Sequence, residues 1–480
     1  MKIVPNAVNP YLRARAVLLP VLTVLVDIPL KHPVKMLKKH RITKMNNKTA
    51  VVIGGGLAGV EAAHQLSKRG IKVTLYEMKP VKFSPAHKSS LLAELVCSNS
   101  LKAERVGSAA GLLKAEMRLF GSVCLEAADK AKVPAGGALA VDRDIFSEEI
   151  TKAIEADENI TLVREELKEI PEDGIVIVAA GPLMSDSLAE SVGKLCGREF
   201  LAFYDAAAPI VTAESIDMEN AFTQSRYDRG GEDDYINCPL DKAQYEEFYE
   251  ALINAESAEL HSFDKRKDVY EGCMPIEVLA SRGMDAMRYG PLKPVGLTNP
   301  KTGHRPWANL QLRKENKDGT MYNLVGFQTN LKFPEQKRVF SMFPALKNAE
   351  FVRYGVMHRN TFLNSPGLLS YDFSMKKAPR IYFAGQISGV EGYMESASSG
   401  ILAGYNASRR IFGEEPILLP KITMLGALSQ YITDESVKHF QPMGAAFGII
   451  DPLDERIKDK KERYERLAQR SLDYYKTIEL

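Results

Sequence analysis

A glycine-rich turn between two short apolar runs is the feature that most restricts how this 480-residue chain can fold. The β-branched run at residues 49–53 leads directly into Gly54-Gly55-Gly56-Leu57-Ala58-Gly59. A helical pattern follows and stops at Gly70, and a second apolar run, residues 71–76, ends at Glu77. This order of strand, glycine turn, helix, strand and acid is typical of a dinucleotide-binding βαβ unit.

Each residue type in this unit has a physical role. Gly54 permits a tight turn, Gly56 lets the backbone approach a pyrophosphate, and Gly59 lets the helix pack closely on the strand. The unpaired N–H groups at the helix N-terminus attract the anion. Glu77, 18 residues after Gly59, is placed to accept hydrogen bonds from an adenosine ribose. We therefore expect residues 54–59 and Glu77 to bind the cofactor.

The choice between NAD and FAD depends on the rest of the chain, because both use this fingerprint. Residues 380–386 (RIYFAGQ) predict a strand that ends in a turn at Gly385 and Gln386, and residues 389–407 predict a helix rich in small residues. A sheet completed by such distant sequence, with a second helix N-terminus directed at the site, suits FAD. The sequence has no second G-x-G-x-x-G unit, so NADH or NADPH would visit the flavin only transiently.

The chain is longer than one hydrophobic core usually organises. We predict an α/β fold with a Rossmann-like FAD-binding domain in two parts, residues 45–184 and 377–480. Residues 185–376 are expected to form an α+β domain inserted between these parts. A helix rich in charge, residues 454–475, is expected on the surface.

The nearly neutral formal charge of +2 hides zones of different sign. Residues 1–44 carry nine basic side chains and one acidic side chain, so the rest of the chain is acidic. Within that acidic remainder, residues 282–338 hold eleven bases and four acids. A local basic zone of this kind keeps a nucleic-acid partner possible in spite of the acidic total.

Residues 1–44 resemble a targeting segment only in part. Two arginines precede an apolar run, residues 16–30, but Pro20, Asp27 and Pro29 interrupt it and no small-x-small cleavage site follows. The run is also shorter than the roughly 20 residues that a membrane-spanning helix needs. We therefore expect translation to begin at Met45 and residues 1–44 to lie outside the fold.

The five cysteines form an odd set without a C-x-x-C pair. This pattern indicates neither a zinc site nor a disulfide framework, and it favours a reducing cytoplasm. We expect no metal and no membrane association.

Several long motifs resemble one known family, from residue 45 to near the C-terminus. They are residues 94–102 (ELVCSNSLK), 133–143 (VPAGGALAVDR), 203–210 (FYDAAAPI), 271–278 (EGCMPIEV), 290–297 (GPLKPVGL), 354–362 (YGVMHRNTF) and 383–397 (FAGQISGVEGYMESA). With these motifs the chain resembles the flavin- and folate-dependent tRNA (uracil-5-)-methyltransferases of the TrmFO family, whose fold is GidA-like. Residues 1–44 have no counterpart in that family.

The resemblance implies an enzyme that forms 5-methyluridine at the T-loop uridine, position 54, of tRNA. The one-carbon unit would come from 5,10-methylenetetrahydrofolate, FADH would reduce it, and NADH or NADPH would reduce the flavin. Two alternatives stay open: the same chemistry on ribosomal RNA, or a flavin oxidoreductase without an RNA substrate.

Uracil C5 is a poor nucleophile until a thiolate adds to C6, so the reaction needs a cysteine and a base. The resemblance assigns roles to Cys273 and Cys97, with Cys273 as the nucleophile and Cys97 as the base or the partner on the flavin side. The two roles could be reversed. We expect Cys124, Cys196 and Cys238 to be small buried residues of the core.

The basic zone is open to two interpretations, RNA contact or a solvated surface. Its charges interleave with Tyr289 and Trp307, which could stack on bases. We expect RNA-binding residues among Arg282, Arg288, Lys293, Lys301 and Arg305; Arg313 and Lys314 belong to the same zone. Phosphate contacts would make the affinity depend on salt.

Overall fold

The first apolar run becomes an inner strand of a six-stranded sheet. The computed structural model describes residues 48–480 apart from 198–199, 229–230, 232–233, 259–273 and 438–439. In it, β1 (Thr49–Ile53) pairs in parallel with β2 (Lys72–Tyr76) and with β7 (Ile175–Val178). The strand order is β16-β17-β7-β1-β2-β6, where β6 is Ile160–Val163, β16 is Ser374–Met375 and β17 is Ala378–Phe383. The predicted Rossmann-like sheet is confirmed.

The sheet is completed by sequence from far along the chain, as predicted. β17 pairs in parallel with β7, so that Ile381 lies opposite Val176. All four residues of β7 are buried, which explains why its sequence is an unbroken apolar run. The short strand β16 runs antiparallel to β17 at the edge.

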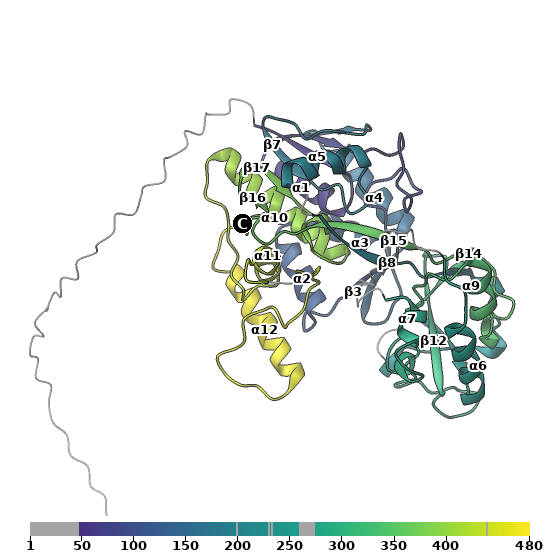
Figure 1. The fold of residues 1–480 in the computed structure, drawn as a ribbon. Helices are drawn as coiled ribbons and strands as arrows, with labels where there is room; N and C mark the ends of the chain where they lie inside the picture. Colours follow the sequence, from purple (N-terminus) through teal and green to yellow (C-terminus); the bar gives the residue numbers. More distant parts are fainter. Residues whose placement is uncertain (1–47, 198–199, 229–230, 232–233, 259–273, 438–439) are drawn as a thin grey trace, which may run out of the picture. The chain divides into compact units, whose positions relative to one another are not determined.

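Two helices cross in close contact next to this sheet (Figure 1). They are α1 (Leu57–Ser67) and α10 (Tyr393–Phe412). A Cβ at Gly400 would lie 2.1 Å from the carbonyl oxygen of Ala58, so the two backbones touch. The predicted helix over residues 389–407 begins only at Tyr393, because Gly389 and Gly392 have φ values of +91° and +119° that a helix does not contain.

Further elements surround the first sheet. Four helices near this sheet are each preceded by a Ser or Asp whose side chain accepts a hydrogen bond from a backbone N–H of the first turn, which is the usual N-cap. These helices are α2 (Ala109–Leu119), α3 (Val123–Ala131), α4 (Arg143–Glu155) and α5 (Asp186–Cys196). A small sheet has the order β3-β5-β4, with β3 at Ser100–Ala103, β4 at Lys132–Val133 and β5 at Ala138–Val141.

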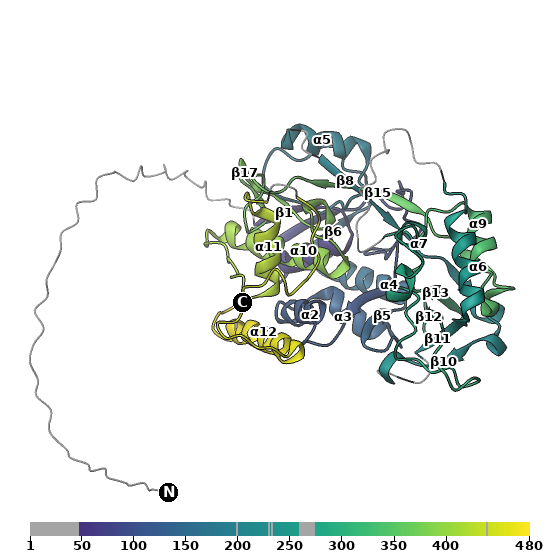
Figure 2. The same ribbon diagram turned by 60° about the horizontal axis from the view of Figure 1, so that its bottom comes forward.

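A second six-stranded sheet is antiparallel throughout (Figure 2). Its order is β10-β11-β12-β13-β9-β14, with β9 at Ile210–Thr212, β10 at Phe222–Thr223, β11 at Tyr235–Leu240, β12 at Ala308–Lys314, β13 at Met321–Leu324 and β14 at Phe351–Arg353. The accompanying helices are α6 (Lys242–Ile253), α7 (Ile276–Ala280), α8 (Ala286–Tyr289) and α9 (Phe333–Phe340). A separate pair joins β8 (Phe200–Ala206) to β15 (Met357–Leu363).

Each large sheet has its own hydrophobic cluster. The cluster beside the second sheet extends from Val211 to Ala349 and contains contacting rings of Phe248, Phe327 and Phe343. The cluster beside the first sheet also includes Leu188 of α5 and Phe373. The domain boundaries at residues 185 and 376 stay predictions.

The C-terminal helix is anchored by a buried carboxylate. α12 (Lys460–Tyr475) starts later than predicted because Asp459 caps it, and its Ser471 and Tyr475 are buried. Both side chains donate hydrogen bonds to Glu116 of α2, as do the backbone N–H groups of the first two residues of α11 (Met424–Thr433). The helix predicted to be surface-exposed therefore has one buried face.

No α-helix in the described part of the chain combines the length and apolar character needed to span a bilayer. The prediction for residues 1–44 falls outside the described residues.

Candidate active site

The glycine-rich turn has the geometry that its sequence predicts. Gly54 has a φ of +104°, and a Cβ there would lie 2.5 Å from the carbonyl oxygen of Ala179. A Cβ at Gly59 would lie 1.8 Å from the carbonyl oxygen of Gly54. Larger residues do not fit at either position, so the turn stays tight and α1 begins close against it.

Gly56 differs from its neighbours, since no atom lies within 4 Å of the position that its Cβ would take. It is the N-cap residue of α1, and the first turn of this helix contains no acidic side chain. The first N–H groups of a helix have no partner within the helix and carry partial positive charge. The open space and these donors fit a pyrophosphate group.

Glu77 is buried beside the same turn. Its Oε2 accepts a hydrogen bond from the Gly55 backbone N–H at 2.7 Å, and its Oε1 accepts one from the Lys79 backbone N–H at 2.9 Å. A carboxylate has about four acceptor positions, so both oxygens can accept further hydrogen bonds. Because Glu77 also lines the adjoining cavity, its carboxylate fits the hydroxyl groups of a ribose.

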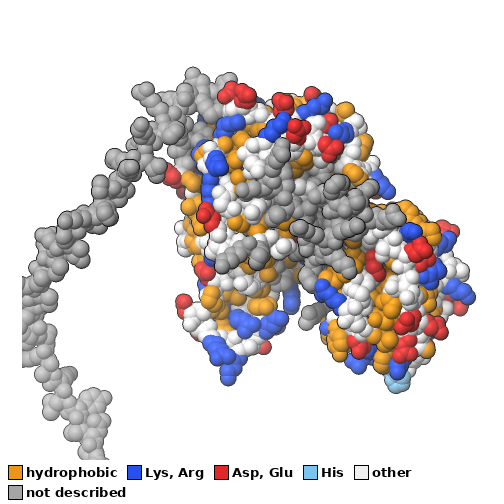
Figure 3. All heavy atoms as spheres, in the orientation of Figure 1, with side chains coloured by type: hydrophobic (Ala, Val, Ile, Leu, Met, Phe, Trp, Pro, Cys, Tyr) orange, Lys and Arg blue, Asp and Glu red, His pale blue; other side chains and the backbone are white. Residues whose placement is uncertain are grey.

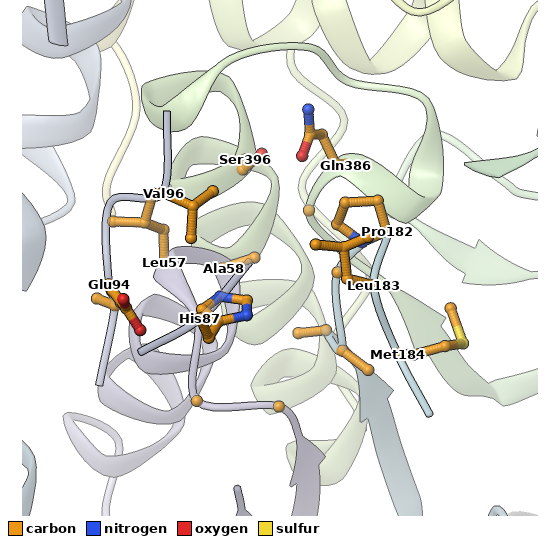
Figure 4. Close-up of a pocket in the computed structure, with 18 of the residues that line it drawn as sticks. Leu57, Ala58, His87, Glu94, Val96, Pro182, Leu183, Met184, Gln386 and Ser396 are labelled. Carbon is orange, nitrogen blue, oxygen red and sulfur yellow. The ribbon is translucent and has the colours of Figure 1, made fainter. Parts of the chain in front are cut away.

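All but one of the nine predicted cofactor residues line one cavity of about 430 Å³ (Figure 4). Gly59 lies outside its lining, whereas the other eight predicted residues border it, namely Gly54, Gly55, Gly56, Leu57, Ala58, Glu77, Gly385 and Gln386. Figure 4 shows Glu94 and Val96 on one side of the space and Pro182, Leu183 and Met184 on the opposite side. The volume lies in the usual range for cofactor pockets.

The N-terminus of α10 borders the same cavity. The Gly385 N–H donates to Ser399 Oγ at 2.7 Å, and Gln386 Nε2 donates to Glu391 Oε2 at 2.7 Å. These contacts fix the end of β17 against the start of α10. The cavity is therefore bordered by two helix N-termini, and both favour negative charge.

A lysine–glutamate ion pair lies at this second helix N-terminus, with Glu395 in the first turn of α10. Lys102 Nζ lies 2.6 Å from Oε1 of the buried Glu395, and both residues line the cavity. Lys102 has a φ of +64°, a left-handed conformation that is uncommon for a residue other than glycine. Close by, desolvation lowers the pKa of the buried Lys114 to about 8. Such features gather where a protein binds charged groups.

Cys97 lies in the lining of the cavity beside Tyr393. The Tyr393 Oη accepts the backbone N–H groups of Cys97 at 2.8 Å and of Ser98 at 3.3 Å, and it lies 3.1 Å from Cys97 Sγ. Burial raises the pKa of Tyr393 well above its usual value. The hydroxyl therefore keeps its proton at neutral pH, and it lies within hydrogen-bonding distance of the sulfur.

Three of the other four cysteines are buried, and the fourth is not among the described residues. Cys124, Cys196 and Cys238 are buried, which confirms that they belong to the core. Burial raises the pKa of Cys124 and of Cys238, so both stay thiols. Cys273, the predicted nucleophile, lies outside the described residues.

The predicted RNA-binding side chains lie in different environments. Arg282, Lys301 and Arg305 are exposed, and Lys293 is half-buried. The guanidinium of Arg288 lies 3.9 Å from the ring centroid of Trp307 and pairs with Asp285 at 2.6 Å. The face in Figure 3 mixes acidic and basic side chains, so phosphate contact would depend on such local groups.

Arg313 corrects one expectation about the basic zone. It is only 6% exposed, so it belongs neither to a solvated surface nor to an open phosphate-binding face. Its Nε donates to Asn99 Oδ1 at 2.9 Å and its Nη2 to Ser98 Oγ at 3.0 Å, beside Cys97.

Sequence reasoning also left three polar residues at this site without a role. They are Lys102, Arg143 and Tyr393, which the structure brings to the cavity or to the Cys97 loop. All three lie in motifs that carried the family resemblance, residues 94–102, 133–143 and 383–397, so a signal was present. Their distance in sequence hid their proximity.

His87 lines the cavity too (Figure 4). Its Nδ1 lies 2.6 Å from Ser84 Oγ, and burial lowers its pKa. Over the described residues, no three or more His, Cys, Asp or Glu side chains come together in a way that could hold a metal ion.

Solved structures with a similar fold include those of GidA. The GidA protein of Aquifex aeolicus, in its form I crystal, superimposes with a TM-score of 0.65 at 18% identity, over 90% of this chain and 76% of that chain. The form II crystal of the same protein gives a TM-score of 0.64. At this identity the likeness concerns the fold alone.

Sequence comparisons are more specific. The family model described as glucose inhibited division protein A matches residues 49–415. The methylenetetrahydrofolate--tRNA-(uracil-5-)-methyltransferase TrmFO of Acetivibrio thermocellus is 58% identical over 425 residues, which is 88% of this chain and 97% of that protein. The protein of the same name from Desulforamulus reducens is 56% identical over 438 residues, or 91% and 97%. This chain therefore belongs to the glucose inhibited division protein A family and, within it, to the TrmFO proteins.

Proposed function

We propose that this protein methylates C5 of the T-loop uridine, position 54, in tRNA, using the methylene group of 5,10-methylenetetrahydrofolate. The observation that carries this proposal is the identity of 58% over 425 residues with a protein named for that reaction. The cavity adds support, because it combines a dinucleotide-binding turn with a cysteine in one space.

FAD is the proposed resident cofactor. Gly54–Ala58 of the turn would hold its pyrophosphate, Glu77 its ribose, and Gly385 and Gln386 would border its ring system. When bound, FAD in its reduced form supplies the electrons that turn the transferred methylene into a methyl group. NADH or NADPH is the proposed reductant, which would visit transiently because the chain has one dinucleotide fingerprint.

Two cysteines carry the proposed chemistry on the base. The Cys273 thiolate adds to uracil C6, so that C5 becomes an enolate carbon able to attack the methylene group. Cys97 then accepts the C5 proton, and the electron pair left on C5 breaks the methylene–nitrogen bond, so that tetrahydrofolate leaves and an exocyclic methylene group remains on the ring. Reduction of this group and release of the Cys273 thiolate from C6 complete 5-methyluridine. Cys97 lines the cavity beside Tyr393, and this position supports its proposed role as the base.

RNA binding is assigned to the basic zone and not to the molecule as a whole. Arg282, Lys301 and Arg305 are exposed and would contact phosphates, with Lys293 and Arg288 beside them. The Arg288–Trp307 stack offers a flat surface of the kind that binds unpaired bases. We propose that residues 185–376 form the inserted domain that presents this zone.

We place the reaction in the cytoplasm. The described cysteines are free thiols, and a reducing compartment keeps thiols in that state.

The test mixes the purified full-length protein with a T-loop RNA hairpin, methylene-labelled tetrahydrofolate and NADPH. We expect label in 5-methyluridine at one position, and none when that uridine is replaced by cytidine. Cys273→Ala should abolish transfer and keep its FAD, whereas Cys238→Ala, a buried control, should keep activity. Flavin reduction without label in the RNA would contradict the proposal and favour an oxidoreductase. Transfer to ribosomal RNA fragments in place of the hairpin would correct the substrate.

A further inference from the structure

Three arginines from separate elements bind the loop that carries Cys97. Arg143, at the start of α4, donates hydrogen bonds to the carbonyl oxygens of Leu95 and Cys97, the latter at 3.3 Å. Arg353 of β14 donates to the carbonyl oxygen of Val96. Three successive carbonyl groups, each a strong acceptor, therefore point at guanidinium groups.

Arg313 of β12 continues this pattern along the loop. It binds the side-chain oxygens of Ser98 and Asn99 at 3.0 Å and 2.9 Å. Asn99, which is fully buried, also donates to the carbonyl oxygens of Lys314 at 2.8 Å and of Val141 at 3.1 Å. Each of the five residues 95–99 thus offers an oxygen to one of the three arginines, which we call the arginine clamp.

The clamp is offset only in part by negative charge. Glu315, buried after β12, accepts from Arg143 Nε at 2.8 Å and from Arg143 Nη2 at 3.2 Å. Other charged groups near the loop occur as pairs, Lys79 with Glu94 and Lys102 with Glu395. Tyr393 is neutral. Three cations and one carboxylate therefore face the loop directly.

We propose that Arg143, Arg313 and Arg353 act as positioning residues that hold the Cys97 loop and supply the positive charge that keeps Cys97 ionised as a thiolate in the cavity. Ionisation releases the thiol proton to solvent. The use of this thiolate as the base in methyl transfer rests on the function proposed above.

Electrostatics supports this assignment. A thiolate is stabilised by nearby cations and by donors aimed at the sulfur, and arginine stays charged even when buried. Desolvation and then the neighbouring charge of Arg143 lower the pKa of Arg353, whereas Tyr393, Glu315 and Cys97 oppose that decrease. Arg143 is likewise desolvated, but Glu315, Tyr393 and Cys97 raise its pKa. The thiol therefore interacts with two of the three guanidinium groups.

The test measures how the ionisation of Cys97 depends on pH. Full-length, FAD-loaded protein carrying Cys273→Ser is alkylated with iodoacetamide between pH 5 and 10, and the Cys97 peptide is quantified by mass spectrometry. We expect the midpoint of the rate profile to lie at least about one pH unit below the ordinary thiol value of about 8.5. One unit corresponds to about a tenfold change in the thiolate fraction.

Two substitutions at one position separate charge from packing. Arg353→Met should raise the midpoint by about one unit, whereas Arg353→Lys, which keeps the charge, should stay near the parent. Arg338→Met, on the exposed face of α9, is the matched control and should leave the profile unchanged.

A midpoint at or above that of an ordinary thiol in the parent protein overturns the proposal, even where Arg353→Met does not fold. An unchanged midpoint in folded Arg353→Met overturns it as well. RNA and folate are absent from this assay, so failed methyl transfer with a normal profile would contradict the proposed function alone.

Discussion

Gly56 shows how a single missing side chain makes room for a ligand. Its Cβ position faces open space within the cavity lining, whereas Gly54 and Gly59 face backbone atoms. Loss of ligand binding and loss of packing can therefore be separated at Gly56, because a side chain there would fill ligand space without disturbing the packing of the protein.

We predict that Gly56→Val folds normally but loses FAD. Its two methyl groups would occupy the position assigned to the pyrophosphate, so the affinity should fall at least about tenfold, or about 1.4 kcal/mol. Flavin absorbance of the purified protein and circular dichroism measure the two properties.

Gly448→Val is the control for this change, since no atom lies within 4 Å of its Cβ position either and it is absent from the cavity lining. It should be as yellow as the parent. A yellow Gly56→Val variant would mean that the cofactor lies elsewhere.

At the residue scale, the sequence predicted those positions whose role depends on their immediate neighbours. The turn glycines and Glu77 belong to one continuous unit, and eight of the nine predicted cofactor residues border the cavity. Arg313 could not be predicted, because its partners Ser98 and Asn99 lie more than 200 residues away and remove it from the surface. A charge in a basic stretch gives no sign of such a partner.

The crossing of α1 and α10 is the contact between elements that shapes the cavity. Gly400 and Gly404 face Ala58 and Ala62 of α1 at backbone distance, so each added carbon would separate the helices. Ala58 also lines the cavity, so the position of α10 affects the site.

We predict that Gly400→Ala destabilises the protein and weakens FAD binding together. Its Cβ would lie 2.1 Å from the Ala58 carbonyl oxygen, a contact that requires backbone movement. Overpacking of this kind costs about 1–3 kcal/mol in the free energy of unfolding. Chemical denaturation and flavin titration measure the two effects.

Gly448→Ala, which meets no atom within 4 Å, should change neither quantity. If Gly400→Ala were as stable as the parent, the two helices would have to be more loosely packed than the structure shows.

At the element scale, the sequence predicted which segments form strands and helices better than where they start. The strand over residues 49–53 agrees with β1, since its ends are marked by a charged residue and a glycine. The start of α10 was placed four residues early, because the sequence does not show that Gly389 and Gly392 adopt positive φ. The buried face of α12 was missed, because it depends on Glu116 of another helix.

Two buried carboxylates influence the stability of the whole molecule. Glu61 of α1 and Glu116 of α2 are fully buried, and desolvation raises the pKa of each from 4.5 to about 7. The folded protein therefore binds protons more tightly than the unfolded chain between these values. The stability that these two groups contribute is therefore lost as pH rises across this interval.

We predict that the melting temperature decreases between pH 5 and pH 7.5 and that Glu61→Gln reduces this slope. Each group contributes on the order of 1–3 kcal/mol over the interval. The amide of Gln keeps an acceptor for Ser122 and for the Cys124 N–H but does not titrate. Differential scanning calorimetry at constant ionic strength measures the slope.

Glu126→Gln, at an exposed position of α3, should keep the slope of the parent. A Glu61→Gln variant with the slope of the parent would show that Glu61 does not take up a proton in the folded protein over this interval.

The arginine clamp has a consequence for the order in which the chain is assembled. Residues 95–99 are made early in synthesis, whereas their arginine partners are made much later. Ser98 and Asn99 are bound by Arg313 of β12, and the Val96 carbonyl is bound by Arg353 of β14. A growing chain that has completed its first glycine turn still lacks these partners. The cysteine acquires its final surroundings only after the second sheet has formed, so a truncated or half-made protein would bear this thiol without the environment that the finished protein gives it.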